Sequence, residues 1–466
     1  MGPRTDRRPT WLSFVLLTLL LAAGIFAGAI ADRLPLPELL SWLLPVGLLS
    51  LALGLFLRRF SSWYLFLALP MAAVLAWSVE VRIWPNGFFH RRTASVDIAG
   101  DLRPTPLKLP EGTDDNTLKN RRLFAPEHAE IGLFAHGLAA PRMLAFDSRG
   151  VLFVSLPGQG RVLALPDRDR DGFADETVEF AAGLDRPHGL AFAGGALLVA
   201  ESGRLLRLQD RDGDLRADAV RVISDDLPSG GGHWTRSLAV GPDDALYVSV
   251  GSDCNACLEE DPRRGTILRF SPDGGEGRIH AWGLRNSVGL TFQPGTDRLW
   301  ASDNGRDMLG DDLPPDEINL VVEGGDYGWP FCYGNRVPDP GLGTDVRCAD
   351  TRPAAVELQA HSAPLGLVFG AGLAAESSWR DDLFVAFHGS WNRRQPTGYK
   401  VVRIPFRQGR PAGPPEDVLA GWRDGKGVWG RPVGLAVGPD GALYLSDDRA
   451  GCVYRIVFKP DAGRRE

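Results

Sequence analysis

The sequence predicts an all-β fold, a six-bladed β-propeller, preceded by three transmembrane helices. One pattern of short apolar strands around a Gly/Asp/Pro turn recurs six times after residue 139, and three long apolar runs precede residue 80. The composition changes between them, from mostly apolar before about residue 85 to rich in Gly, Asp, Arg and Pro after about residue 95. We therefore expect a membrane anchor over residues 1–84, a linker over 85–130 and a propeller over 131–460.

The three apolar runs, residues 11–31, 39–57 and 62–79, contain no charged residue. An α-helix needs about 20 apolar residues to cross a bilayer, so each run is long enough to span it. A cleaved signal peptide is the alternative for the first run, but two further apolar runs follow it. Three membrane spans are therefore the favoured interpretation.

Arginines beside these runs predict which side of the membrane the propeller occupies. They gather before the first run and between the second and third, at Arg4, Arg7, Arg8, Arg58 and Arg59. Both places lie on the same side of the membrane, and the positive-inside rule makes that side cytoplasmic. We therefore expect a multi-pass protein of the cytoplasmic membrane, with its propeller on the periplasmic or extracellular side.

The cysteines agree with export to an oxidising compartment. Cys254 and Cys257 form a C-x-x-C, Cys332 and Cys348 stand 16 residues apart, and Cys452 is left over. No His follows the C-x-x-C, so covalent haem attachment is not supported, and no second C-x-x-C completes a four-thiolate zinc site. Disulfides within the two pairs are the expected outcome.

A shared leucine marks the repeats, at Leu144, Leu190, Leu238, Leu290, Leu367 and Leu435. Short strands with turn signals, and no amphipathic helix between them, argue against a parallel α/β sheet. A β-sandwich is the remaining alternative, but six copies in register are typical of propeller blades with loop insertions.

Polar residues just before each repeat are expected to form a ring, because equivalent positions of every blade surround the propeller axis. They include Arg186, His233, Arg285, Asn286 and Arg431. Guanidinium and imidazole groups at a channel mouth can bind a polycarboxylate and move a proton. Each could instead be a solvated loop residue, but their convergence from separate blades favours a site. The net charge of −7 gives a nucleic-acid partner no electrostatic support.

Acidic runs in two successive repeats space carboxylates two residues apart before a Gly, as calcium loops do. Their candidate ligands are Asp167, Asp169, Asp171, Asp210, Asp212 and Asp214. The alternative is a solvated turn with arginine counter-charges. The run from Ser302 to Asp307 is a further candidate, because backbone carbonyls beside Gly305 suit Ca²⁺.

Several motifs together resemble the pyrroloquinoline-quinone (PQQ)-dependent glucose/sorbosone dehydrogenases, over roughly residues 130–458. The most specific are His233-x3-Ser-Leu-Ala-Val-Gly-Pro-Asp243, Leu284-Arg-Asn-x-x-Gly-Leu290, and Asp316-Glu-Ile-Asn-Leu320 followed by Gly324-Gly-Asp-Tyr-Gly-Trp-Pro330. Two others, Gly389-Ser-Trp-Asn-Arg393 and Gly430-Arg-Pro-Val-Gly434, are more similar to the sorbosone branch.

The resemblance implies a role for each ring residue. His233 matches the base that takes the hydroxyl proton while hydride passes to the quinone. Arg285 and Asn286 match residues beside the quinone oxygens, where Arg285 stabilises the reduced oxyanion. Arg431 matches an arginine that pairs with a cofactor carboxylate.

The resemblance also implies calcium. The backbone carbonyls of Gly305 and Arg306 match ligands of a Ca²⁺ that polarises the quinone, and Glu317 and Tyr327 match a structural calcium site. The cofactor-side residue Asn304, like Arg306, departs from the glucose branch, which has Gln and Pro at these two places.

A cofactor-binding lysine of the glucose branch has no clear match in this chain, and a second arginine near Arg431 is missing. Arg186, Arg236 and Arg393 are the candidates to replace them.

The expected function is that of a membrane-anchored PQQ-dependent dehydrogenase that oxidises an aldose, sorbosone or a similar aldehyde. Its electrons would pass to a respiratory acceptor, either a membrane quinone or a soluble carrier. The alternatives are a metal-dependent lactonase-type hydrolase and a non-catalytic recognition propeller, since a fold alone does not fix function.

Overall fold

The computed structural model describes residues 101–111, 118, 120–375, 377–425 and 427–459. The chain divides into two compact units, and among the described residues only 391–396 belong to a different unit from the rest. The three predicted membrane spans lie outside the described residues. Within those residues, no helix is sufficiently long and apolar to cross a bilayer.

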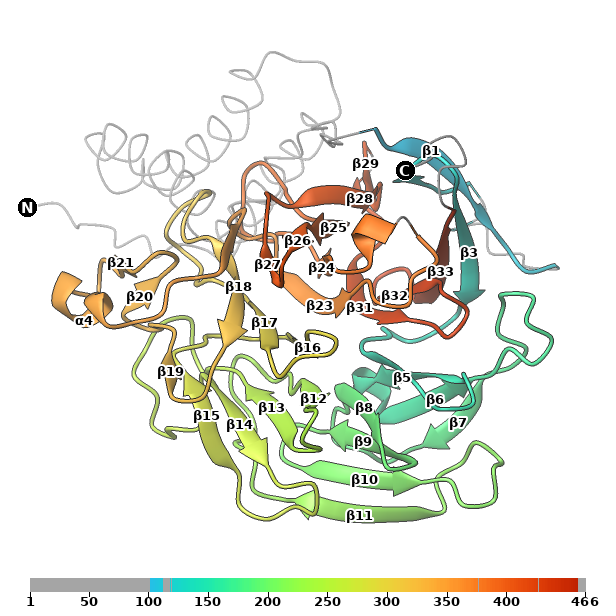
Figure 1. The fold of residues 1–466 in the computed structure, drawn as a ribbon, viewed down its shortest axis with the longest axis horizontal. Coiled ribbons are helices and arrows are strands. Elements are labelled where there is room, and N and C mark those ends of the chain that lie inside the picture. Colours follow the sequence, from blue (N-terminus) through green and yellow to red (C-terminus); the bar gives the residue numbers. More distant parts are fainter. Residues whose placement is uncertain (1–100, 112–117, 119, 376, 426, 460–466) are drawn as a thin grey trace, which may run out of the picture. The chain divides into compact units, whose positions relative to one another are not determined.

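The fold is an all-β propeller in which sheets succeed one another in chain order (Figure 1). The first sheet contains β4 (Leu144–Phe146), β5 (Leu152–Leu156), β6 (Arg161–Leu165) and β7 (Val178–Ala181). The second contains β8 (Gly189–Ala193), β9 (Ala196–Ala200), β10 (Leu205–Gln209) and β11 (Ala219–Ser224). Every pairing within these two sheets is antiparallel.

The next two sheets carry most of the predicted site. The third contains β12 (Leu238–Val240), β13 (Leu246–Val250), β14 (Thr266–Phe270), β15 (Arg278–Trp282) and the short β19 (Gly325–Asp326). The fourth contains β16 (Gly289–Phe292), β17 (Leu299–Asp303), β18 (Asp316–Val321) and β22 (Val356–Leu358).

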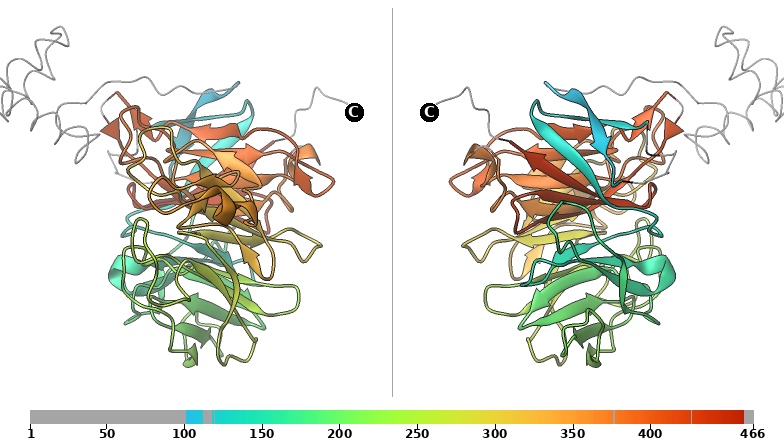
Figure 2. Two further views of the ribbon diagram at one scale, coloured as in Figure 1. Left: turned by 90° about the vertical axis from the view of Figure 1, so that its left-hand side faces the viewer. Right: turned by 90° about the vertical axis from the view of Figure 1, so that its right-hand side faces the viewer.

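A ten-stranded sheet joins the two ends of the described chain. In order across the sheet its strands are β23 (Pro364–Phe369), β24 (Leu383–Phe387), β25 (Lys400–Ile404), β28 (Glu416–Ala420), β2 (Arg122–Ala125), β1 (Arg103–Lys108), β3 (Ala129–Ala135), β33 (Cys452–Phe458), β32 (Leu443–Asp447) and β31 (Pro432–Val437). Figure 2 shows β1 and β3 beside the red strands of the C-terminal end.

Part of the segment predicted as a linker therefore forms strands, namely β1, β2 and the start of β3. β1 pairs in parallel with β3, and β3 pairs antiparallel with β33, with Leu133 opposite Tyr454. The apolar residues of this segment explain the difference, because Leu123, Ala125 and Ile131 are completely buried in the core that the ten-stranded sheet shares. They form a strand pattern too short and irregular to match the six repeats.

Several short elements lie between the strands of the main sheets in the described sequence. They are the strand pairs β20 (Cys332–Tyr333) with β21 (Val337–Pro338), β26 (Phe406–Arg407) with β27 (Arg410–Pro411) and β29 (Arg423–Asp424) with β30 (Gly427–Val428), the helix α4 (Asp345–Ala349) and two 3₁₀ turns, η2 (Pro157–Gln159) and η3 (Ser377–Trp379). Disulfides join Cys254 to Cys257 and Cys332 to Cys348, as predicted, and Cys452 is buried in β33 outside both.

The second strand of each repeat is the most buried part of the fold. All five residues of β5, β9, β13, β17, β24 and β32 are buried, in agreement with the apolar runs of the repeats. Several of these strands contain a serine whose hydroxyl donates a hydrogen bond to the backbone of the next repeat. Ser155 donates to the carbonyl of His188 (3.0 Å), and Ser302 donates to that of Leu365 (2.7 Å).

The first strands of the repeats meet each other around the propeller axis. β4 contacts β8, β8 contacts β12, and the succession continues through β16, β23 and β31 back to β4. Glycines before the shared leucine permit this approach: a Cβ at Gly189 would lie 2.6 Å from the Arg236 carbonyl oxygen, and one at Gly366 would lie 2.5 Å from that of Val433. The loops entering these strands are consequently held close together.

Candidate functional site

Acidic residues at the end of a second strand fix the loops that carry the predicted site residues. Asp303, the last residue of β17, accepts hydrogen bonds from the backbone N–H groups of Arg285 (3.0 Å) and Asn286 (2.7 Å). Asp447, at the end of β32, accepts in the same way from the N–H of Arg431 (2.7 Å). Burial raises the pKa of Asp303 to about 7 and that of Asp447 to about 6.

Arg285 is buried, with only 4% of its surface exposed. Its guanidinium donates to the backbone carbonyl of Asn255 (2.9 Å), to the Asn255 side-chain oxygen (2.9 Å) and to the carbonyl of Asn304 (3.2 Å), and it forms an ion pair with Asp307 at 3.3 Å. These contacts fix the plane of the guanidinium, as a group that stabilises a developing anion requires.

His233 precedes β12 and is partly buried. Its Nδ1 lies 2.9 Å from the carbonyl oxygen of Ser252 and 2.8 Å from the Ser252 hydroxyl. A carbonyl oxygen can only accept, so Nδ1 carries the hydrogen and Nε2 is the nitrogen that can take a proton. Burial, followed by the charge of Arg285, lowers the pKa of His233 to about 4, so the imidazole is neutral at pH 7.

Asn286 and Asn304 complete this part of the ring. Asn304 donates from its backbone N–H and its side-chain amide to the Asn286 carbonyl, each at 3.2 Å. A Cβ at Gly251 would lie 2.6 Å from the His233 Cβ and 2.9 Å from Asn286 Oδ1. His233 and Asn286 therefore flank the same glycine, and the structure brings His233, Arg285, Asn286 and Asn304 together.

Arg431 belongs to a second cluster, in the ten-stranded sheet. Its guanidinium donates to the carbonyls of Gly389 (2.9 Å) and His388 (3.2 Å) and lies 5.1 Å from the centre of the Tyr399 ring. The imidazole of His388 contacts both oxygens of Asp448 at 3.0 Å, and Asp448 also pairs with a further arginine, Arg142, at 2.8 Å. Burial opposes ionisation of Asp448, but these partners outweigh it and lower its pKa to about 2.

Arg142, His188 and Arg236 link the two clusters. They share one register, two residues before the shared leucine, in the first three repeats. His188 is completely buried, its Nδ1 faces the Arg236 carbonyl at 3.3 Å, and burial followed by the charge of Arg142 lowers its pKa. At this register the other repeats carry Val288, Leu365 and Val433, which pack together in an apolar cluster. The axis is thus basic on one side and apolar on the other.

Arg186 lies outside these clusters, and Arg393 belongs to the other unit. Arg186 is exposed, has a left-handed backbone conformation (φ 52°), and places its guanidinium 5.0 Å from the centre of the Trp234 ring. Arg393 belongs to the unit that contains residues 391–396, where its Nε donates to the Gln395 carbonyl (3.0 Å). A cofactor role for either residue stays a prediction.

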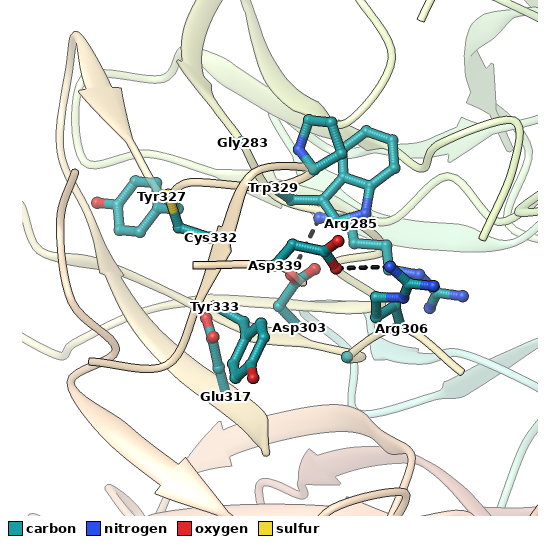
Figure 3. Close-up of a pocket in the computed structure, with 12 residues that line it drawn as sticks. Gly283, Arg285, Asp303, Arg306, Glu317, Tyr327, Trp329, Cys332, Tyr333 and Asp339 are labelled. Carbon is teal, nitrogen blue, oxygen red and sulfur yellow. Dashed lines mark hydrogen bonds and ion pairs between the residues drawn. The ribbon is translucent and has the colours of Figure 1, made fainter. Parts of the chain in front are cut away.

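The residues predicted to bind calcium at the quinone line one small cavity of about 20 Å³, enough for a single ion or water (Figure 3). Gly305 and Arg306 contribute to it, together with Asp303 and Glu317. Burial, followed by the charge of the neighbouring Asp303, raises the pKa of Glu317 to about 7. Two buried carboxylates in such a space fit a hard cation.

Other contacts in this cavity limit which atoms face an ion. Arg306 forms an ion pair with Asp339 at 2.5 Å. The Tyr327 hydroxyl donates to the Leu320 carbonyl (2.6 Å) and accepts from the Val322 N–H (3.0 Å). Figure 3 shows this hydroxyl directed away from Asp303 and Glu317. Tyr327 therefore lines the cavity with its ring.

The two acidic loops gather carboxylates, but not the full predicted sets. Oxygens of Asp167, Asp169 and Asp175 lie within 4.8 Å of one another, as do those of Asp210, Asp212 and Asp218. The third predicted residue of each loop instead accepts from the backbone two residues later: Asp171 from Phe173 (2.8 Å) and Asp214 from Arg216 (2.8 Å). In the second loop Arg149 pairs with Asp210 at 3.1 Å, which supplies part of the positive charge that an ion would bring.

The sequence interpretation missed Arg142, Asn255 and Asp448, and did not group His188 with the ring. The repeat register could have identified Arg142 and His188, because both align with Arg236 two residues before the shared leucine. Asp448 follows the acid that ends β32. Asn255 lies inside the C-x-x-C and has no counterpart in other repeats, so no repeat-based signal marks it.

We predict that His233 titrates near pH 4 in the apoprotein. Replacing Arg285 with Ala should raise the His233 pKa, because the adjacent positive charge is removed, but leave it below 6.5, because burial is the larger cause. Nitrogen-detected NMR titration of histidine-labelled protein would measure both values. His280, whose lowered pKa has burial as its main cause, serves as the internal control. A His233 pKa unaffected by the substitution would contradict this electrostatic coupling.

Comparison with family models gives two matches, each to a part of the chain. A model described as TrAA12-like matches residues 335–459, and a domain of unknown function, DUF7133, matches residues 138–320. Together they cover most of the propeller.

Several curated proteins are similar in sequence. A PQQ-dependent pyranose dehydrogenase of Coprinopsis cinerea is 27% identical over 69% of this chain and 52% of its own length. A PQQ-dependent sugar dehydrogenase of Hypocrea jecorina is 26% identical over 72% of this chain and 89% of its own. An uncharacterized protein of Borreliella burgdorferi is 34% identical over 46% of this chain and 57% of its own. The chain thus spans little more than half the length of the first and third of these.

Solved structures give the same fold. The iodide structure of the Trichoderma reesei AA12 enzyme superposes with a TM-score of 0.62 at 25% identity, over 71% of this chain and 96% of that one. The holo PQQ domain of the Coprinopsis cinerea pyranose dehydrogenase superposes with a TM-score of 0.63 at 23% identity, over 75% and 98%. The propeller is therefore similar to those of PQQ-dependent sugar dehydrogenases, which are oxidoreductases.

Proposed function

We propose that this chain is a membrane-anchored PQQ-dependent dehydrogenase that oxidises an aldose, sorbosone or a similar aldehyde. The observation that carries the proposal is a neutral imidazole, His233, beside the buried and fully oriented guanidinium of Arg285. The similarity to PQQ-dependent sugar dehydrogenases supports the same chemistry. Contacts within the chain are sufficient to orient both side chains.

The basic residues of the ring fit the proposed cofactor, which is a polycarboxylate. Arg431, Arg142 and Arg236 come from three different repeats, and burial, followed by Arg264, lowers the pKa of Arg236 to about 10. The carboxylates of the cofactor would lie beside these crowded, partly buried guanidinium groups. Their negative charge would offset the free-energy cost of burying the positive charges. When bound, the quinone would supply the two-electron acceptor.

His233 would act as the base that takes the proton of the substrate hydroxyl. Its Nδ1–H is fixed on Ser252, so Nε2 is the acceptor. The pKa of about 4 keeps the imidazole unprotonated at pH 7, and an anionic cofactor nearby would raise that pKa toward the working pH. Arg285 would stabilise negative charge that develops on the acceptor side.

Calcium is proposed at the small cavity that is lined by residues of both predicted sites, Gly305 and Arg306 of the quinone-side site and Glu317 of the structural site. The buried carboxylates of Asp303 and Glu317 support it, because an ion would relieve their mutual repulsion. At the two acidic loops, the grouping of three carboxylates in each supports a structural calcium ion.

We also propose that the propeller has six blades. The ten-stranded sheet contains two four-stranded runs, β23-β24-β25-β28 and β3-β33-β32-β31, which β2 and β1 join. The position of the shared leucine in six successive repeats supports counting each run as a blade.

Reconstitution tests the proposed activity. The full chain, purified in detergent and supplied with PQQ and Ca²⁺, should reduce a redox dye when an aldose, sorbosone or a simple aldehyde is added, and chelation should reduce the rate. Quinone absorbance after gel filtration would report cofactor retention. No dye reduction together with no retained cofactor would favour a recognition propeller, and lactone hydrolysis without quinone would favour the hydrolase alternative.

Replacing His233 with Ala should leave PQQ binding intact but lower turnover by about 10²-fold or more, because the proton acceptor is lost. Steady-state dye reduction and quinone titration would measure the two quantities. The matched control is His136→Ala, since His136 is exposed and outside the ring. Unchanged turnover in the His233 variant would refute its assignment as the base.

The membrane anchor predicted over residues 1–84 is part of the proposal, with a respiratory quinone or soluble carrier as the electron acceptor. Three uncharged runs and the flanking arginines support it. After cell fractionation the full chain should sediment with membranes and resist extraction by carbonate, whereas a chain that begins at residue 95 should not. Release of the full chain by carbonate would contradict a spanning anchor.

A further inference from the structure

The loop closed by the Cys254–Cys257 disulfide contacts Arg285 directly and reaches His233 through Ser252. It follows β13, and the bridged cysteines are three residues apart with their Cα atoms 6.1 Å from each other. Only two residues, Asn255 and Ala256, lie between them. The loop is partly exposed, so packing alone does not fix its conformation, and the cross-link removes much of its freedom.

Asn255 uses its whole amide group to hold two other segments in place. Its side-chain oxygen accepts from the Arg285 guanidinium (2.9 Å) and from the backbone N–H of Asp307 (2.7 Å), and its side-chain NH₂ donates to the Asp307 carbonyl (3.0 Å). Its backbone carbonyl accepts from Nε of Arg285 (2.9 Å). Arg285 is thus held at two nitrogens by a single residue, which fixes the position and the plane of its guanidinium.

The same loop reaches His233 through Ser252. The Ser252 hydroxyl donates to the carbonyl of Cys254 (2.8 Å) and therefore accepts from His233 Nδ1 (2.8 Å). The backbone N–H of Ser252 donates to the Arg285 carbonyl (2.8 Å), which ties the two functional residues together. A shift of this loop would move the imidazole and the guanidinium relative to each other.

We propose that Asn255, held in the loop that the Cys254–Cys257 disulfide closes, is a positioning residue that sets the placement of Arg285 relative to His233. The inference rests on the proposed dehydrogenase function of this site. Side chains that act on a reacting centre depend on such outer contacts, and a displacement of about 1 Å can lower a rate about 10²-fold.

The electrostatics of His233 provide a readout that does not require cofactor or turnover. The charged groups that affect its pKa are Arg285, Arg236 and Asp253. Arg236 donates to the His233 carbonyl (3.0 Å) and to the Thr235 carbonyl (2.8 Å), so its position does not depend on Asn255. Movement of Arg285 alone should therefore change the His233 pKa.

The test compares three variants of the full-length protein with the wild type. They are Asn255→Ala, Asn255→Gln and a double variant that combines Cys254→Ser and Cys257→Ser. NMR titration of the apoprotein should show a higher His233 pKa in Asn255→Ala, because Arg285 is no longer held beside the imidazole. In the reconstituted enzyme, kcat/KM should fall about 10²-fold and the acidic limb of its pH profile should move upward. Asn255→Gln retains the amide and should recover part of both effects.

A control variant and a second test variant distinguish a positioning role from a general loss of structure. Asn335 is exposed, so Asn335→Ala should change neither quantity. The double cysteine variant should move the His233 pKa in the same direction as Asn255→Ala, and it provides a second test if that variant does not fold. A wild-type protein that reduces no dye would defeat the proposed function, whereas the NMR comparison would still decide the positioning role. An unchanged His233 pKa in both Asn255→Ala and the double cysteine variant would overturn it.

Discussion

Neighbouring sheets of this propeller meet through their backbones, and the geometry of the site depends on that approach. Glycines before the shared leucine leave no room for a Cβ against the next sheet, as at Gly189 and Gly366. Serine hydroxyls of the second strands then bond to backbone carbonyls across the junction, as Ser302 does to Leu365. Loops that begin where two sheets are joined in this way are held at a fixed distance from each other. Side chains as distant in sequence as Arg142 and Asp448 therefore form an ion pair.

The residues around the propeller axis are basic on one side and apolar on the other, and this division arises at the position two residues before the shared leucine. Where three repeats place Arg142, His188 and Arg236, the other three place aliphatic side chains that pack together. Buried cations without anions close by are costly, and the lowered pKa of Arg236 and of His188, for which burial is the main cause, reflects that cost. A protein that binds an anionic planar molecule gains back this energy on binding, whereas one that binds a neutral partner does not.

The sequence alone predicted the repeats, both disulfides and the grouping of His233 with Arg285 and Asn286, because each depends on a recurring register or on spacing. It did not predict β1, β2 and β3, which lack the repeat pattern: β2 pairs with β28, β3 pairs with β33, and β1 lies between β2 and β3. Nor could it identify Asn255, whose role depends on where a four-residue loop lies against another sheet. The acidic loops were predicted from carboxylate spacing, but the carboxylates that gather in each loop include Asp175 and Asp218 in place of Asp171 and Asp214, which spacing alone does not reveal.

The pairing of β3 with β33 has a consequence for biogenesis. The two strands lie more than 300 residues apart, and during synthesis β3 emerges among the first elements of the domain and β33 last. Until the final strand arrives, one edge of β3 lacks the partner it has in the finished sheet, and exposed edges invite association with other chains. The hydrogen-bonded ladder that closes the ring can therefore form only after the last strand has been synthesised.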